Sequence, residues 1–216
     1  MLPEVDWLAL GMAPDTLDYI DRTVEPLYPA LVLDLIRRQK NLVLVPTLGV
    51  RYRADVYTRN PELLEQPGLV PFLTPPERAF VLANARKDLA GPDTARALQV
   101  WPTLAGKLRQ LRSLGLPVAI GSDAGSPLNF QADSIWWELE AWRSSGVSHR
   151  EALTAATETG ARVLGLTDVG RLVTGARADF VLYRGDVERG PFDAARVLAV
   201  GKSGVLYVTD GKWVER

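Results

Sequence analysis

Three short apolar runs, separated by segments of helical periodicity, constrain the fold of this chain most. The runs are Val5–Leu10, Leu42–Thr47 and Leu116–Gly121, and the second is continuous and rich in β-branched residues. Strands that are buried on both faces of a parallel sheet have this composition, because helices cover both faces. Alternation of such runs with helical segments predicts an α/β fold, either part of a barrel or an open sheet.

The helical segments have recognisable ends. Thr74–Glu77 and Ser148–Glu151 each have the pattern of a capping box, in which two side chains satisfy free backbone N–H groups at a helix start. The first predicts a helix over about 75–90, and the second predicts a helix through Leu164 that ends at Gly165. Further helices are expected over about 28–40, from Asp93 to Leu114 with a break or kink at Pro102, and from Asp133 or Ser134 onward.

Residues 48–73 are predicted to form a lid or binding loop. They contain prolines and glycines among aromatic residues and arginines, and they are too many for a simple connection. Arg51 and Tyr52, together with Arg53, follow directly after the Thr47 run, where a substrate would enter. Arginines there would bind a carboxylate through charge-assisted hydrogen bonds, so Arg51 and Tyr52 are candidates for substrate binding. The alternative is an exposed loop with ordinary basic residues.

From about Leu166 the pattern changes to short β segments. They are Gly170–Leu172, Phe180–Tyr183, Val197–Val200, Val205–Val208 and Trp213–Val214. Asp210-Gly211 is typical of a type I′ hairpin turn. We therefore expect two parts, a barrel-like portion over 1–165 and a small β module over 166–216.

Charge and composition exclude several classes of function. The chain has 25 basic and 26 acidic residues without blocks of one sign, which excludes a surface for nucleic acid or an anionic membrane. No stretch approaches the ~20 apolar residues of a membrane span, and the first residues lack the features of a signal peptide, so a cytoplasmic protein is expected. The absence of cysteine excludes thiolate metal sites, and only one histidine is present.

Asp123 is the residue with the clearest chemical potential. It lies in Gly121–Gly125, directly after the third apolar run. An Asp in such a turn is more often structural than catalytic. However, active sites of α/β barrels lie at the C-terminal ends of the strands. Beside a divalent metal, a carboxylate there can ligate the ion or take a proton from the bound water.

Four stretches follow one another in a recognisable order: Gly121–Gly125, Glu151–Leu166, Gly170–Val181 and Asp210–Val214. Together they resemble the amidohydrolase superfamily, most closely its imidazolonepropionase-like and prolidase-like branch. The Leu42–Thr47 run is also similar to the family's seventh barrel strand.

This resemblance implies the C-terminal strands and helices of a (β/α)8 TIM barrel, followed by the C-terminal part of a small β-sandwich. It also implies hydrolysis of a carbon–nitrogen bond in a small amide or cyclic amide. A divalent metal, zinc by expectation, would be bound with Asp123 as both ligand and catalytic residue. Residues 1–165 fall short of the roughly 250 residues of a whole barrel, so we expect a missing N-terminal segment or self-association.

One departure from the family pattern bears directly on activity. Leu10 stands where the family's sixth strand carries a histidine, and the family's first metal-binding histidines would precede residue 1. His149 is expected to be a solvated residue of a helix start, so Asp123 would be the one recognised ligand. The isolated chain is therefore expected to be inactive, and whether it holds a metal stays open. The alternative is a non-catalytic remnant that serves as a binding or structural module.

Two further features have structural interpretations. Trp136 and Trp137 would either stack on a substrate or pack in the core, and core packing is favoured for at least one of them. Asp179, a family residue by resemblance, is expected to form a turn or a hydrogen bond where the chain enters the β module.

Overall fold

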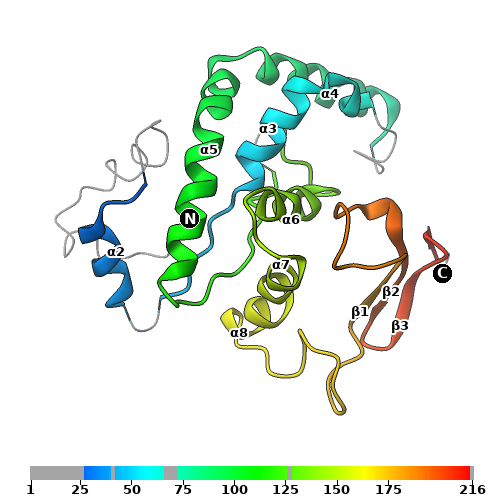
Figure 1. Ribbon diagram of the computed structural model, residues 1–216. Coiled ribbons are helices and arrows are strands. Elements are labelled where there is room, and N and C mark those ends of the chain that lie inside the picture. Colours follow the sequence, from blue (N-terminus) through cyan, green and yellow to red (C-terminus); the bar gives the residue numbers. More distant parts are fainter. Residues whose placement is uncertain (1–26, 40–41, 66–72, 126–127, 215–216) are drawn as a thin grey trace.

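The computed structural model describes residues 27–39, 42–65, 73–125 and 128–214 (Figure 1). A helical part comes first, and a small antiparallel sheet follows it beside α6 and α7. The predicted run Val5–Leu10, and with it Leu10, lies outside the described residues. None of the described helices is both long and apolar enough to cross a membrane.

The helical part consists of α-helices with short 3-10 and π-helical turns. These elements are α2 (Ala30–Arg37), α3 (Gly49–Arg59), η1 (Pro61–Glu65), α4 (Pro75–Leu89), α5 (Pro92–Ser113), α6 (Ser134–Ser144), α7 (His149–Thr154), the π-helical η2 (Ala155–Thr159) and α8 (Gly160–Val163).

Both capping boxes are confirmed. Glu77 Oε2 accepts hydrogen bonds from the Thr74 backbone N at 2.9 Å and from its hydroxyl at 2.6 Å. At the start of α7, the Glu151 N–H donates to Ser148 Oγ at 3.3 Å, and Glu151 Oε2 accepts from the Ser148 N–H at 3.2 Å. Gly165, with φ of 70°, follows α8 as predicted. Local capping therefore sets these helix ends.

Helix α5 continues through Pro102, so of the two predicted outcomes the break is wrong and the kink stays a prediction. A proline inside a helix costs about 3 kcal/mol, because one hydrogen bond is lost and the ring contacts the preceding turn. Leu104, Leu108 and Leu111 lie on one face of α5 and are buried. Burying each leucine contributes about 1.5–3 kcal/mol, which is enough to offset that cost.

The prediction of a loop over 48–73 is wrong, because α3 and η1 occupy most of the described residues in this range. Gly49, Arg53, Ala54 and Tyr57 are buried, and their spacing places them on one face of a helix. The face contains an arginine and a tyrosine in place of aliphatic residues. This composition hid the helical periodicity from sequence analysis.

The Leu42–Thr47 and Leu116–Gly121 runs lie side by side and parallel. The Leu44 N–H donates to Pro117 O at 3.0 Å, and the Ala119 N–H donates to Leu44 O at 2.9 Å. They form a single parallel bridge, Leu44 with Val118, in place of the regular strands predicted. Both runs contain a proline. Because proline has no backbone N–H, fewer hydrogen bonds can form between the two runs. The partial barrel is therefore not established and stays a prediction.

The C-terminal sheet has four antiparallel strands in the order β1-β2-β3-β4. Asp210 and Gly211 have φ of 51° and 73°, as a type I′ turn requires. Gly170–Leu172, expected as a strand, is irregular. Gly170 has φ of 85°, which directs the chain away from extended geometry. The strands are β1 (Phe180–Tyr183), β2 (Val197–Lys202), β3 (Val205–Thr209) and β4 (Lys212–Trp213).

The sheet contacts the helices through the loop 184–193. Phe192 is buried in the largest core cluster, together with Leu108, Leu139 and Trp142. His149 Nε2 lies 2.7 Å from Gly190 O, so the one histidine joins α7 to this loop rather than facing solvent alone. The loop and the helices therefore share a single hydrophobic core.

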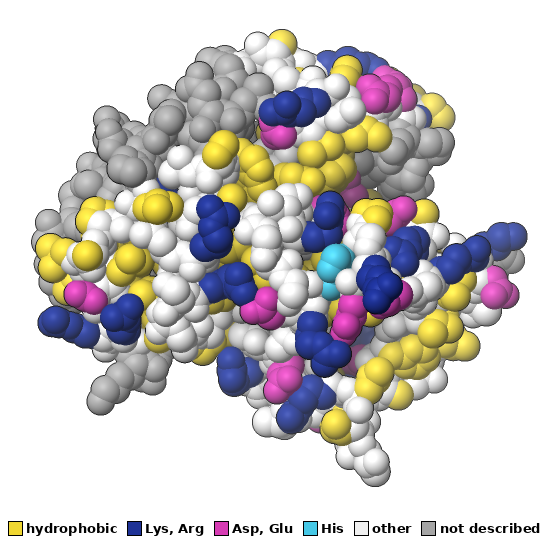
Figure 2. All heavy atoms as spheres, viewed as in Figure 1, with side chains coloured by type: hydrophobic (Ala, Val, Ile, Leu, Met, Phe, Trp, Pro, Cys, Tyr) yellow, Lys and Arg dark blue, Asp and Glu magenta, His cyan; other side chains and the backbone are white. Residues whose placement is uncertain are grey.

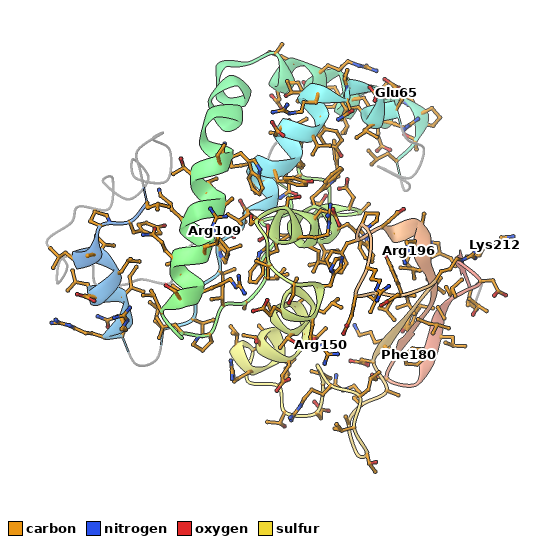
Figure 3. The ribbon with its side chains drawn as sticks, viewed as in Figure 1. Glu65, Arg109, Arg150, Phe180, Arg196 and Lys212 are labelled. Atoms are coloured by element: carbon orange, nitrogen blue, oxygen red, sulfur yellow. The ribbon has the colours of Figure 1, made fainter. Side chains whose placement is uncertain are left out.

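Arg196 organises the same loop (Figure 3). Its guanidinium donates to four backbone carbonyls, and its planar group lies 4.6 Å from the centre of the Tyr183 ring. The carbonyls belong to Arg184, Asp186, Arg189 and Pro191, at 2.9–3.3 Å.

The sheet itself leaves apolar side chains exposed. Val181, Val200, Val208 and Trp213 are cross-strand partners in register and form one row across the four strands. Val181 is 57% and Trp213 68% exposed. Figure 2 shows hydrophobic side chains gathered over the sheet. The module thus has antiparallel pairing, with a register shift in each of the β1–β2 and β2–β3 pairs, but little core of its own.

Candidate functional site

Asp123 lies in a turn directly after the Leu116–Gly121 run. Its backbone has φ of 49°, and its side chain is exposed. The buried Asn129 holds this turn, because its Nδ2 donates to Ser122 O at 2.6 Å and to Asp123 O at 2.5 Å. The Gly125 N–H donates in return to Asn129 O at 2.8 Å. The turn that carries the candidate carboxylate is therefore well defined.

The two parallel runs end beside each other. Thr47 ends the Leu42–Thr47 run and also has φ of 49°. A Cβ on Gly121 would lie 2.5 Å from Val45 Cγ1 and 3.9 Å from Thr47 Oγ1. Only glycine allows this close approach. Asp123 and the start of α3 are thus brought to one edge, as the sequence predicts for the carboxyl ends of parallel strands.

A buried guanidinium lies near Asp123. Arg53, on α3, is 0% exposed and interacts electrostatically with Asp123, Asp133 and Tyr57. Burial disfavours its charged form and lowers the pKa of Arg53 to about 10. Arg53 stays protonated near neutral pH, so it places a positive charge close to the candidate carboxylate.

Asp133 lies near the same buried arginine. Its Oδ2 accepts hydrogen bonds from the Tyr57 hydroxyl at 3.1 Å and from Trp137 Nε1 at 2.5 Å. Burial raises the pKa of Asp133, and burial also raises the pKa of Tyr57. These groups form a buried polar cluster with Arg53 that sequence analysis did not predict.

Glu138 connects α6 to the start of α3. Its Oε2 accepts a hydrogen bond from the Gly49 N–H, and its Oε1 accepts one from Trp142 Nε1 at 2.9 Å. A Cβ at position 49 would lie 2.8 Å from the Glu138 N, so glycine is required there. Glu138 is 0% exposed, and burial raises its pKa to about 7. The sequence signal that could have indicated this contact is Glu138 itself, an acidic residue between Trp137 and Trp142 in one predicted helix.

The remaining candidates lie on helices. Arg51 and Tyr52 belong to the first turns of α3 and are half-buried. The Tyr52 ring lies 4.9 Å from the Trp101 ring, and its hydroxyl accepts from Ser144 Oγ at 3.0 Å. Tyr52 thus has a packing role, whereas its part in substrate binding, like that of Arg51, stays a prediction.

Trp136 and Trp137, for which the sequence allows core packing or substrate stacking, both pack against other rings. Trp136 stacks on Tyr183 with centroids 6.4 Å apart, and Trp137 meets Tyr57 edge-on at 5.4 Å. The favoured interpretation as core is confirmed. Asp179 makes the hydrogen bond expected where the chain enters the β module, because its Oδ1 accepts from the N–H of Ser203, in the turn between β2 and β3, at 2.6 Å.

The described residues do not form a metal site by themselves. They include no group of three or more His, Asp or Glu side chains placed to hold an ion. A catalytic zinc usually takes three protein ligands, and Asp123 supplies one carboxylate. The side chains in hand therefore do not fit a complete metal centre.

A groove of about 400 Å³ lies at the other end of the Leu116–Gly121 run. Leu116, Val118, Trp142 and Ala155 contribute its apolar lining, and Arg112 lies at its side. Asp123 is not among its lining residues.

Solved structures share the fold over most of this chain. A Xaa-Pro dipeptidase with bound methionine in its active site superposes with a TM-score of 0.53 and 22% identity, over 83% of this chain and 37% of that one. An uncharacterised protein superposes with a TM-score of 0.51 and 18% identity, over 84% of this chain and 38% of that one.

Sequence comparison gives the family. Imidazolonepropionase of Streptomyces griseus is 37% identical over 38% of this chain, and that of Streptomyces coelicolor is 36% identical over 47%. The matched stretches span only 20% and 25% of those proteins. The model of the amidohydrolase family matches residues 80–214. Because this match spans more than half of the chain, the protein belongs to the amidohydrolase family.

Proposed function

We propose that the chain is the C-terminal part of a hydrolase that cleaves a carbon–nitrogen bond of a small amide or cyclic amide. The observation that carries the proposal is the placement of Asp123, exposed at the shared end of two parallel runs and close to the buried charge of Arg53. The imidazolonepropionase relatives and the dipeptidase fold support the same reaction class.

Asp123 acts in this proposal as the proton-transfer group. It takes a proton from the attacking water as the water oxygen bonds to the amide carbon. It returns that proton to the nitrogen as the carbon–nitrogen bond breaks. Arg51, at the first turn of α3, is proposed to bind an anionic group of the substrate beside Tyr52.

Members of this family are generally metal-dependent, and a divalent ion, zinc by expectation, is proposed for the complete enzyme. Asp123 would be this chain's ligand, and the other ligands would come from residues outside those described. The part assigned to this chain is therefore limited to proton transfer and substrate contact.

Completion by an N-terminal barrel segment is proposed for residues 1–165, with 166–216 as a separate β module. The single parallel bridge between the two runs supports this, because parallel strands depend on partners from distant segments. The chain is expected to work in the cytoplasm, which cell fractionation would test.

The experiment is co-expression of the chain with the reading frame upstream of Met1, followed by assays on cyclic and dipeptide-like amides. We expect Asp123→Asn to lower kcat by about 10²- to 10⁴-fold. Asp34→Asn is the matched control, since Asp34 is an exposed partner of Arg37 and should leave kcat unchanged. Full activity of Asp123→Asn would contradict the proposal.

A second candidate function is a non-catalytic remnant that binds a partner. The lack of a complete ligand group among the described residues favours it. Metal content of the co-expressed protein with Leu10→His distinguishes the two. A gain of about one bound zinc per chain supports the enzyme, whereas no gain supports the remnant.

A further inference from the structure

We infer that Asn129 is the positioning residue of the candidate carboxylate at Asp123. This inference rests on the proposed function, since it concerns the same site. Asn129 is 2% exposed, and its side-chain nitrogen bonds two consecutive carbonyls of the turn, those of Ser122 and Asp123. A primary amide nitrogen has two donor hydrogens, so one Asn can hold both carbonyls together.

The carbonyls of Ser122 and Asp123 determine the orientation of the Asn129 side-chain amide. Asn129 Oδ1 is buried and has no hydrogen-bond partner within the described part of the chain. The alternative orientation, with oxygen and nitrogen exchanged, would place Oδ1 against two carbonyl oxygens and would leave both without a donor. The role of Asn129 therefore requires a donor, which an aspartate of the same shape does not provide when ionised.

Asn129 is itself fixed by the core. Its neighbour Leu128 is buried against Tyr57, Leu64 and Leu82. Leu128 has φ of 60°, a conformation that bulky residues seldom adopt. Such strain persists where surrounding contacts impose it, and here the core supplies those contacts.

Because the core fixes Asn129, its hydrogen bonds restrict the position of the turn that carries the Asp123 carboxylate. Asp123 is in the left-handed region at φ of 49°, and Gly125, at φ of 100°, returns its N–H to the Asn129 carbonyl. Three hydrogen bonds between Asn129 and the turn define the backbone from which the Asp123 side chain extends. A displacement of about 1 Å in a catalytic group can cost about 100-fold in rate.

The test compares Asn129→Asp with Asn60→Asp in the co-expressed protein. Asn60 also donates its side-chain amide to a backbone carbonyl, that of Val56 at 3.0 Å, but at the end of α3. We expect Asn129→Asp to lower kcat by about 10- to 100-fold with KM within about twofold. Asn60→Asp should change neither, although both variants should lower Tm.

The outcomes separate the two proposals. An inactive unsubstituted protein overturns both the proposed function and the role of Asn129. An active one in which Asn129→Asp retains kcat overturns only the role of Asn129. If Asn129→Asp does not fold, hydrogen exchange of the side-chain amide in the unsubstituted protein decides. Exchange of the Asn129 amide as fast as that of an exposed asparagine overturns the inference, and strong protection supports it.

Discussion

The parallel runs and the C-terminal sheet have opposite combinations of hydrogen bonding and burial. Leu44 is 0% exposed, yet its run forms one parallel bridge. The sheet has antiparallel pairing along all four strands, yet β3 is exposed over most of its length. The β2–β3 and β3–β4 pairs close through two-residue turns, whereas parallel strands depend on distant segments. Regular strands therefore form where their partners are adjacent in sequence, and burial does not replace those partners.

The largest effect should come from the buried charges on the helical side of this comparison. Glu138→Ala removes the acceptor for Gly49 N–H and Trp142 Nε1, and it leaves Arg53 buried without that charge. We expect a loss of about 3–5 kcal/mol in the free energy of unfolding, measured with urea. Glu62→Ala, at an exposed position of η1, is the control and should change it by less than about 0.5 kcal/mol. Equal losses of unfolding free energy for Glu138→Ala and Glu62→Ala would contradict the importance of the buried charge.

A pair of leucine truncations compares the two regions directly. Leu44→Ala empties a buried position and should cost about 2–5 kcal/mol. Leu182→Ala, in β1, changes a side chain that is 55% exposed and should cost clearly less, about 1 kcal/mol or below. The measurement is again urea unfolding of both variants. A larger loss for Leu182→Ala than for Leu44→Ala would show that the sheet has a hydrophobic core of its own, contrary to the exposure of its side chains.

The dependence of stability on pH sharpens the same contrast. The pKa of Glu138 is about 7 in the folded protein and near 4.5 when exposed. The folded state therefore holds this proton more tightly, and the resulting stability is present below about pH 4.5 and is lost as pH rises through 7. Glu138→Gln should remove part of this slope, worth about 1–3 kcal/mol. Urea midpoints from pH 4.5 to 8 measure it, and an unchanged slope would contradict the assignment.

The smallest effect is expected at a hairpin turn of the sheet. Gly211→Ala introduces a side chain at φ of 73° and should cost about 1–2 kcal/mol. Gly160→Ala is the matched control, because Gly160 is helical and an added Cβ meets only Ala155 O at 3.7 Å. It should be neutral or stabilising by up to about 1 kcal/mol. Thermal unfolding of both variants gives the comparison.

Local features of the fold could be predicted from sequence, and the polar core could not. Thr74 with Glu77, and Asp210 with Gly211, act within a few residues, so their patterns determine the structure. Helix α3 was missed because its buried face carries Arg53 and Tyr57, which hydrophobic periodicity does not count. Its position depends on Glu138, 89 residues away.

The candidate site divides in the same way. Asp123 could be named from its place after an apolar run, because the turn follows the run directly. Asn129 could not, and Arg53 could be named only as a loop arginine near a substrate, since their roles depend on contacts through space with Asp123 and its turn. A single polar residue in a loop has no spacing pattern that indicates which carbonyls it will bind.

The carbonyl contacts of Arg196 have a consequence for mutational tolerance. A lysine keeps the charge but offers three hydrogens from one point, so it cannot serve four separated oxygens as the planar group does. The loop that it shapes brings Phe192 into the shared core. Attachment of the β module to the helices thus depends in part on this half-buried arginine, where an apparently conservative exchange to lysine is expected to be harmful.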